Sequence, residues 1–143
     1  ANGTIAFDTL QTSGQISGTA RSLDTDYIVR GSNKSFAIFQ MDGTAAISNS
    51  FNTTSLTDNG TGNFTLSHTN NFSSIAYGHT GDVCFDSSAT TVIFNIEGAD
   101  GVAEATVYQT SSFNGESAYV NNSNARTNSD TPRINIEFFG DIT

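Results

Sequence analysis

The sequence predicts an all-β fold, an antiparallel β-sandwich of jelly-roll-like form with an extended N-terminal arm. Apolar and polar residues alternate with a period of two in many short segments, and no helical period lasts longer than a turn. β-branched and aromatic residues fill these segments. Strands at this spacing, in a chain with only one Pro, are typical of a sandwich or a barrel, of which we expect the sandwich.

Several strands can be placed in chain order. The clearest alternation covers residues 35–41, 63–68, 90–97, 103–109 and 133–139. Weaker alternation covers residues 4–10, 27–30, 45–50, 74–77, 82–85 and 117–121. Turn-forming residues separate them at Asp42-Gly43, Asp58-Asn59-Gly60, Gly98-Ala99-Asp100-Gly101 and Asn114-Gly115.

The chain is predicted to have two parts, residues 1–30 and a β-sandwich domain over residues 31–143. The first part is polar and interrupted by Gly, with isolated apolar residues at Ile5, Phe7, Leu10, Ile16 and Leu23. This pattern is typical of an arm that docks on, or oligomerises with, another chain. Equally, residues 1–30 can supply the first strands of the sandwich.

Residues 121–131 contain no large apolar side chain. Ordering a residue costs roughly 1.5 kcal/mol, and this segment has little apolar surface to bury in return. We therefore expect a solvated loop, or one that a partner orders.

The charge of the chain excludes some partners. The net charge is −9, and residues 35–143 carry all of it, with Arg126 and Arg133 against eleven acidic residues. No cation lies between Lys34 and Arg126. Binding to nucleic acid requires clustered Lys and Arg, as does binding to an anionic membrane surface, so we expect neither. No apolar run approaches the 18 or so residues of a membrane span.

The acidic turn segments and the His and Cys residues do not match the spacing of a known metal site. Asp58-Asn59-Gly60-Thr61-Gly62, Asp24-Thr25-Asp26 and residues 82–86 lack the spaced acids of a calcium loop, and we interpret the first of them as a hairpin turn. His68, His79 and Cys84 match no zinc spacing. We expect no metal and no cofactor.

The sequence shows no catalytic motif. A Gly-x-Ser-x-Gly elbow is absent, and Cys84 lies between Val83 and Phe85 in an expected strand, which favours a buried and inert thiol. Fourteen acidic residues supply carboxylate pairs by chance alone, so they do not indicate a glycosidase. We expect no enzyme and assign no catalytic residue.

Sugar recognition has only a weak signal. The chain has no Trp, which leaves Tyr27, Tyr77, Tyr108 and Tyr119 as possible platforms, each with the core edge as the alternative. Loops rich in Asn and Ser could still form polar contacts with a glycan.

The apolar content predicts self-association. Leu, Ile, Val and Phe make up 32 of 143 residues, just above the roughly 20% below which disorder is common. A thin core with open strand edges is stabilised when identical copies pair, so we expect a homo-oligomer. The single Cys84 and the lack of a charged-then-apolar leader favour synthesis in a reducing cytoplasm.

An ordered set of motifs carries a family resemblance. These motifs are Asp24-Thr25-Asp26-Tyr27, Gly31-Ser32-Asn33-Lys34, the 36–39 strand, Asp42-Gly43-Thr44 and the run Ser50-Phe51-Asn52-Thr53-Thr54-Ser55-Leu56-Thr57-Asp58-Asn59-Gly60-Thr61-Gly62-Asn63-Phe64-Thr65. They resemble the repeated β-module of virion structural proteins in tailed phages, especially marine and cyanobacterial ones, over roughly residues 24–77. Two departures are Phe36, where Trp is common, and Ile47-Ser48-Asn49, which lacks a frequent Arg.

The resemblance implies a β-rich, trimer-prone module of tail fibres and particle-surface proteins, without catalytic residues. We therefore expect a virion protein that is assembled in the host cytoplasm and decorates the particle as a trimeric capsid knob or cement. Its N-terminal arm would dock on the major capsid protein or another virion protein. The alternative is a tail-fibre or receptor-binding module for a host surface glycan or protein, and a hydrolytic enzyme is a weaker third.

Overall fold

The computed structural model describes residues 15–17, 22–24, 31–84, 95–98, 104–120, 123 and 125–143. The chain divides into two compact units, Ala1–Ser32 and Asn33–Thr143. In the first unit, β1 (Gln15–Ser17) and β2 (Ser22–Asp24) form an antiparallel two-stranded sheet of their own. The strands predicted over residues 4–10 and 27–30 lie outside the described residues.

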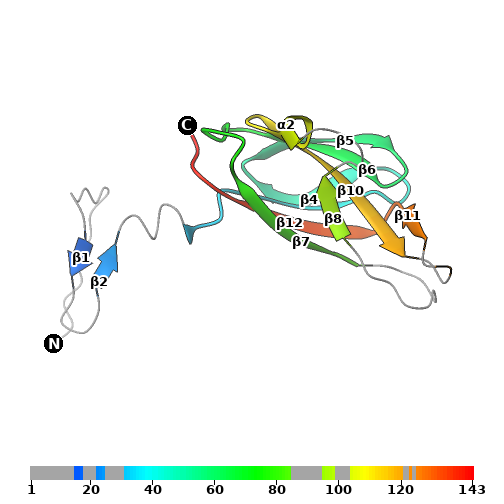
Figure 1. The fold of residues 1–143 in the computed structure, drawn as a ribbon, viewed down its shortest axis with the longest axis horizontal. Coiled ribbons are helices and arrows are strands. Elements are labelled where there is room, and N and C mark those ends of the chain that lie inside the picture. The colour runs from blue at the N-terminus through cyan, green and yellow to red at the C-terminus, as the bar shows by residue number, and fades with distance from the viewer. Residues whose placement is uncertain are drawn as a thin grey trace. The chain divides into compact units, whose positions relative to one another are not determined.

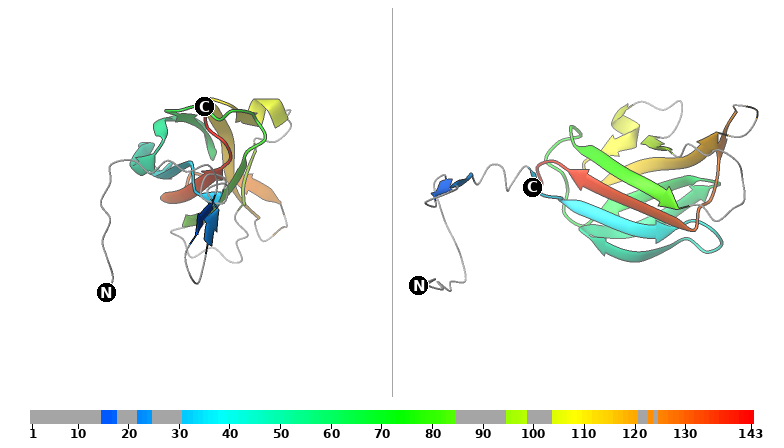
Figure 2. Two further views of the ribbon diagram at one scale, coloured as in Figure 1. Left: turned by 90° about the vertical axis from the view of Figure 1, so that its left-hand side faces the viewer. Right: turned by 90° about the horizontal axis from the view of Figure 1, so that it is seen from below.

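The second unit consists of two antiparallel sheets that pack face to face, so the predicted all-β sandwich is confirmed. One sheet has the order β4-β3-β12-β7 (Figure 1). Its strands are β3 (Ser35–Gln40), β4 (Ala46–Phe51), β7 (Gly78–Cys84) and β12 (Arg133–Phe139). Figure 2 (right) shows β3, β12 and β7 side by side.

The other sheet has the order β11-β10-β6-β5. Its strands are β5 (Thr53–Gly60), β6 (Asn63–His68), β10 (Ser112–Val120) and β11 (Arg126–Asn128), and the short strands β8 (Asn95–Gly98) and β9 (Tyr108–Gln109) also pair with β10. The long strand β10 pairs with several other strands. Its first half pairs with β6, and its second half pairs with β8 and β11.

Alternate residues of the facing strands build the core. In β3, β6 and β12 every second residue is buried, as the period-two pattern predicts. Phe39 of one sheet meets Phe64 of the other edge to face, with ring centroids 4.9 Å apart. Five fully buried Phe rings supply much of the core volume: Phe39, Phe64, Phe72, Phe113 and Phe138.

A single residue carries the chain from one sheet to the other. β4 ends at Phe51 and β5 begins at Thr53, and Asn52 between them has a φ of 54°. Its Nδ2 donates to the carbonyl oxygens of Lys34 (3.0 Å) and Asn70 (3.2 Å), and its Oδ1 accepts from the Asn70 amide (2.7 Å). Asn tolerates the left-handed region better than other residues with a Cβ, so this crossing explains why Asn stands here.

Two strand predictions are wrong. Residues 103–109 were expected to be extended, but α2 (Glu104–Val107) occupies most of that range. Val107 and Tyr108 both pack against the core, which two successive residues of a strand cannot do. Residues 73–75 form bends rather than a strand, and they let Tyr77 stack on Phe72 with ring centroids 4.1 Å apart before β7 begins.

Two turn or loop predictions are also wrong. Asn114 and Gly115 lie inside β10, where a Cβ on Gly115 would stand 2.5 Å from Cζ of Phe64, so this Gly makes room for a core ring. Within residues 121–131, β11 pairs with β10 and Thr131 is fully buried. Strand β5 was not predicted, because most of its side chains are polar and exposed.

Candidate binding surfaces

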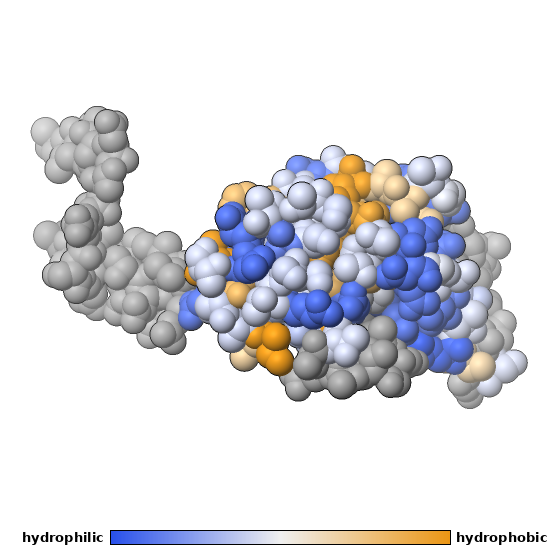
Figure 3. All heavy atoms as spheres, turned by 90° about the horizontal axis from the view of Figure 1, so that it is seen from above, coloured by the Kyte–Doolittle hydropathy of each residue, from blue (hydrophilic) through white to orange (hydrophobic). Residues whose placement is uncertain are grey.

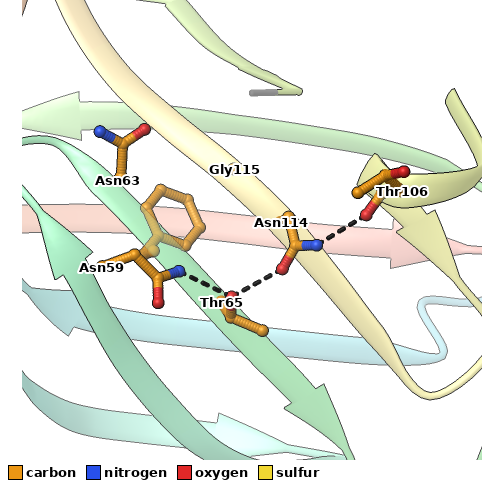
Figure 4. A pocket seen from close by; sticks show the side chains of 7 residues that line it. Asn59, Asn63, Thr65, Thr106, Asn114 and Gly115 are labelled. Atoms are coloured by element: carbon orange, nitrogen blue, oxygen red, sulfur yellow. Dashed lines mark hydrogen bonds between the residues drawn. The ribbon is translucent and has the colours of Figure 1, made fainter. Parts of the chain in front are cut away.

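The outer face of the β5-β6-β10 sheet carries a pocket of about 360 Å³. Figure 4 shows the residues that line it, which are Asn59, Asn63, Phe64, Thr65, Thr106, Asn114 and Gly115. Thr65 and Asn114 are register partners across β6 and β10, and both alternate with core residues, so their side chains face outward. No charged side chain lines this pocket.

A chain of hydrogen bonds links these polar groups (Figure 4). Asn59 Nδ2 donates to Thr65 Oγ1 (2.8 Å), Thr65 Oγ1 donates to Asn114 Oδ1 (2.6 Å), and Asn114 Nδ2 donates to the carbonyl oxygen of Thr106 (2.6 Å). Each link fixes the orientation of the next group. The pocket therefore presents amide and hydroxyl groups whose directions are already set.

An irregularity in the β5–β6 hairpin places Asn59 at the pocket. Asp58 is paired with Phe64 and Gly60 with Asn63, which leaves Asn59 as an extra residue in a β-bulge. Gly60 has a φ of 115°, and its amide donates to Asp58 Oδ1 at 2.8 Å. The segment 58–62 thus belongs to a hairpin, as interpreted, but its first three residues end β5 and the turn itself is Thr61-Gly62.

A second hollow lies on the outer face of the β4-β3-β12-β7 sheet. It has a volume of about 480 Å³, and Phe36, Ile38, Arg133 and Glu137 are among the residues that line it. Phe36 stacks against Phe51 with ring centroids 6.4 Å apart, and Phe51 is 57% exposed. This surface mixes apolar side chains with charges of both signs.

Most of the surface is polar. The face in Figure 3 is largely hydrophilic or intermediate, with a few small hydrophobic areas. Large apolar side chains that are exposed include Phe51, Ile75 and Ile142. The helical part of the described chain contains no segment with the length and hydropathy to cross a membrane.

The structure does not bring the soft ligand candidates together. His68 is buried among aromatic rings, whereas His79 Nδ1 lies 2.8 Å from Tyr108 Oη. Cys84 is exposed, so the predicted buried thiol is wrong: Val83 takes the inward position of β7, and the next residue faces outward. Within the described ranges, no three His, Cys, Asp or Glu side chains are placed to hold a metal ion.

The acidic candidates engage local partners. Asp82 Oδ1 accepts a hydrogen bond from Asn135 Nδ2 at 2.6 Å across β7 and β12. Asp24 lies in β2, and Asp26 and Asp86 fall outside the described residues.

The candidate Tyr platforms contribute mainly to the core or its edge. Tyr77 is buried, its hydroxyl donates to the Ser112 carbonyl (3.0 Å) and the Gln109 carbonyl (3.1 Å), and burial raises its pKa. Tyr108 and Tyr119 are half-buried, and Tyr27 lies outside the described residues.

One buried polar cluster was not predicted. Ser35 Oγ lies 3.2 Å from His68 Nδ1 and 3.0 Å from Thr53 Oγ1. A Ser–His pair is the core of many nucleophilic sites, but Ser35 is 0% and His68 6% exposed, so no substrate reaches either. Burial lowers the pKa of His68 to about 4, which keeps the ring neutral. The cluster connects β3, β5 and β6, and no local sequence motif indicates it.

Comparison with protein-family models, curated proteins and solved structures finds no match to this chain.

Proposed function

We propose that this chain is a structural protein of a phage virion that decorates the particle surface as a homotrimeric capsid knob or cement. The division of the chain into Ala1–Ser32 and Asn33–Thr143 is the observation that carries the proposal. The larger unit holds three cations and eleven acidic residues, whereas the smaller holds two and three. A small docking unit and an acidic, solvent-facing body suit a protein that coats a particle.

The state of the polar residues supports a role without catalysis. The Ser35–His68 pair is closed to solvent, and its hydrogen bonds link strands of the two sheets. Asp58 and Asp82 bind groups within their own hairpin or sheet. These contacts hold parts of the sandwich together, and the proposal gives them a structural role.

Strand β4 supports self-association. It stands at the end of its sheet, and its six residues include no charge and no Pro. Charges and Pro are the usual devices that keep edge strands from pairing with another chain. Three copies that each present this edge to a different surface of the next copy would close a ring.

Light scattering on the purified full chain tests the trimer. We expect three times the chain mass of 15.1 kDa. Ser48→Lys places a charge on the exposed edge of β4 and should lower the mass to one chain. Thr61→Lys, an equally charged change in the exposed turn between β5 and β6, should leave the trimer intact. A monomeric parent chain would refute the trimer.

Quantification in purified particles tests the location. A decoration protein should be present in numbers comparable to the major capsid protein, and a fibre protein in only a few copies. Deletion of residues 1–23 should give a soluble body that no longer joins the particle. Continued incorporation would contradict the docking role of the N-terminal unit.

The alternative is a tail-fibre or receptor-binding module. The neutral, amide-lined pocket on β5, β6 and β10 favours it, because such a pocket offers contacts to a host glycan. A low copy number per particle would select this alternative.

A further inference from the structure

We propose that the pocket lined by Asn59, Asn63, Phe64, Thr65, Thr106, Asn114 and Gly115 binds one ring of a neutral saccharide. The inference holds for a decoration protein and for a fibre alike, because it depends only on the pocket. Its volume of about 360 Å³ lies in the range of small-ligand sites.

The first argument is the charge of the lining. No cation is present to hold a phosphate or carboxylate, and no carboxylate is present to hold an amine. Residues 33–143 are strongly acidic, which further disfavours an anion. A neutral ligand is the class that the lining admits.

The second argument is the set of polar atoms turned toward the ligand. Asn59 and Asn114 each use one amide hydrogen internally, on Thr65 Oγ1 and on the Thr106 carbonyl, and each keeps a second hydrogen. Within the described residues, Asn59 Oδ1 and Asn63 Oδ1 accept no hydrogen bond. Paired amide donors and acceptors match hydroxyl groups, which both donate and accept.

The third argument is preorganisation. The bonds from Asn59 through Thr65 and Asn114 to Thr106 hold three side chains before any ligand arrives, so binding orders little. The Phe64 ring that borders the pocket is only 1% exposed and belongs to the core, so the polar groups carry the contacts to the sugar. No exposed aromatic platform stacks on the sugar ring, so one site should bind only at about millimolar concentration. Three sites on one trimer would raise the avidity.

The test is a titration of the ¹⁵N-labelled full chain with glucose, galactose, mannose and N-acetylglucosamine, followed by NMR. We expect at least one of these sugars to shift the side-chain amide signals of Asn59 and Asn114 saturably. N-acetylneuraminic acid, which is anionic, should not. If none of the four neutral sugars shifts these signals, or if the anionic sugar binds more tightly, the inference is overturned.

A pair of matched variants locates the site. Thr65→Val keeps the shape of the side chain but breaks the bonds to Asn59 and Asn114, and it should weaken binding about tenfold. Thr54→Val removes a similar exposed hydroxyl pair, with Thr69 (3.0 Å), outside the pocket and should leave binding unchanged. Equal binding by Thr65→Val and the parent would refute the assignment, whereas the copy number in particles tests the proposed function separately.

Discussion

The backbone amide of Gly62 donates to Oδ1 of Asp130 at 2.7 Å, across 68 residues of chain. The carbonyl oxygen of Gly62 accepts from the Ser117 amide (2.8 Å), and the Ser129 amide donates to the Ser117 carbonyl (3.0 Å). The turn between β5 and β6 is thereby clamped between β10 and the segment that follows β11. Three distant parts of the second sheet depend on a residue without a side chain.

Gly62→Ala should therefore destabilise the fold strongly. Its φ is 71°, and a Cβ would lie 2.4 Å from the Ser117 carbonyl oxygen and 2.8 Å from the Ser129 nitrogen. We expect the free energy of unfolding to fall by about 3 kcal/mol or more, measured by urea denaturation. Gly43 has a φ of 72° with nothing within 4 Å, so Gly43→Ala should cost only about 1 kcal/mol. Equal losses would contradict the clamp.

Substitutions at Asn52 should separate backbone conformation from side-chain bonding. Gly in this position accepts the φ of 54° but loses the bonds to Lys34 and Asn70, whereas Ala loses both advantages. Thermal unfolding should rank the parent above Asn52→Gly and Asn52→Gly above Asn52→Ala, with about 1 kcal/mol between the two variants. The reverse order of the two variants would show that the left-handed backbone conformation at position 52 does not destabilise a residue with a Cβ.

Acid should weaken the protein through His68. Its pKa is lowered from 6.5 to about 4 because burial disfavours the charged ring. As the pH falls, His68 therefore becomes protonated in the unfolded chain before it does so in the folded chain. Its contribution to the free energy of unfolding is complete above pH 6.5 and is lost as the pH falls toward 4. The loss should amount to about 3 kcal/mol.

Urea denaturation at several pH values between 7.5 and 4 measures this loss. A His68→Gln variant, although less stable at neutral pH, should lose less stability over the same range. An NMR titration that places the His68 pKa near 6.5 would contradict the burial argument.

Arg126 should stabilise the fold more than Arg133 does. Arg126 Nη2 lies 2.6 Å from Glu116 Oε2, and the Glu116 side chain is only 7% exposed. Arg126→Met leaves a buried carboxylate without this partner and should lower the free energy of unfolding by about 2 kcal/mol. Arg133 is exposed and bonds Asn135 Oδ1 at 3.2 Å, so Arg133→Met should change it by about 0.5 kcal/mol or less. Similar effects of both changes in denaturation experiments would refute the role of the Glu116 pair.

Regular alternation in the sequence was enough to predict β3, β6 and β12, because one face of each strand is buried. The same rule failed for α2, where the chain turns so that neighbouring residues both reach the core. It also missed β5, whose side chains are mostly exposed and polar. Alternation detects a buried face, so a strand that lacks one leaves no such trace.

The pocket could not be predicted for a different reason. Asn59, Thr65, Thr106 and Asn114 come from four separate segments, and each is an ordinary polar residue by itself. The bulge in the β5–β6 hairpin and the pairing of β6 with β10 bring them together. The loops rich in Asn and Ser indicated possible polar contacts with a glycan, but not which residues would form a pocket.

The amino-acid sequence alone determined the all-β class, the inward positions of its regular strands and the concentration of negative charge after Lys34, since composition and local periodicity carry these properties. The tertiary structure decided that Gly115 makes room for the Phe64 ring and that Asn52 connects the two sheets. It also decided that Cys84 is exposed and that Ser35 and His68 form a buried hydrogen-bonded pair. Each of these depends on contacts, or on exposure, set by residues far apart in the chain, which a pattern of neighbouring residues does not record.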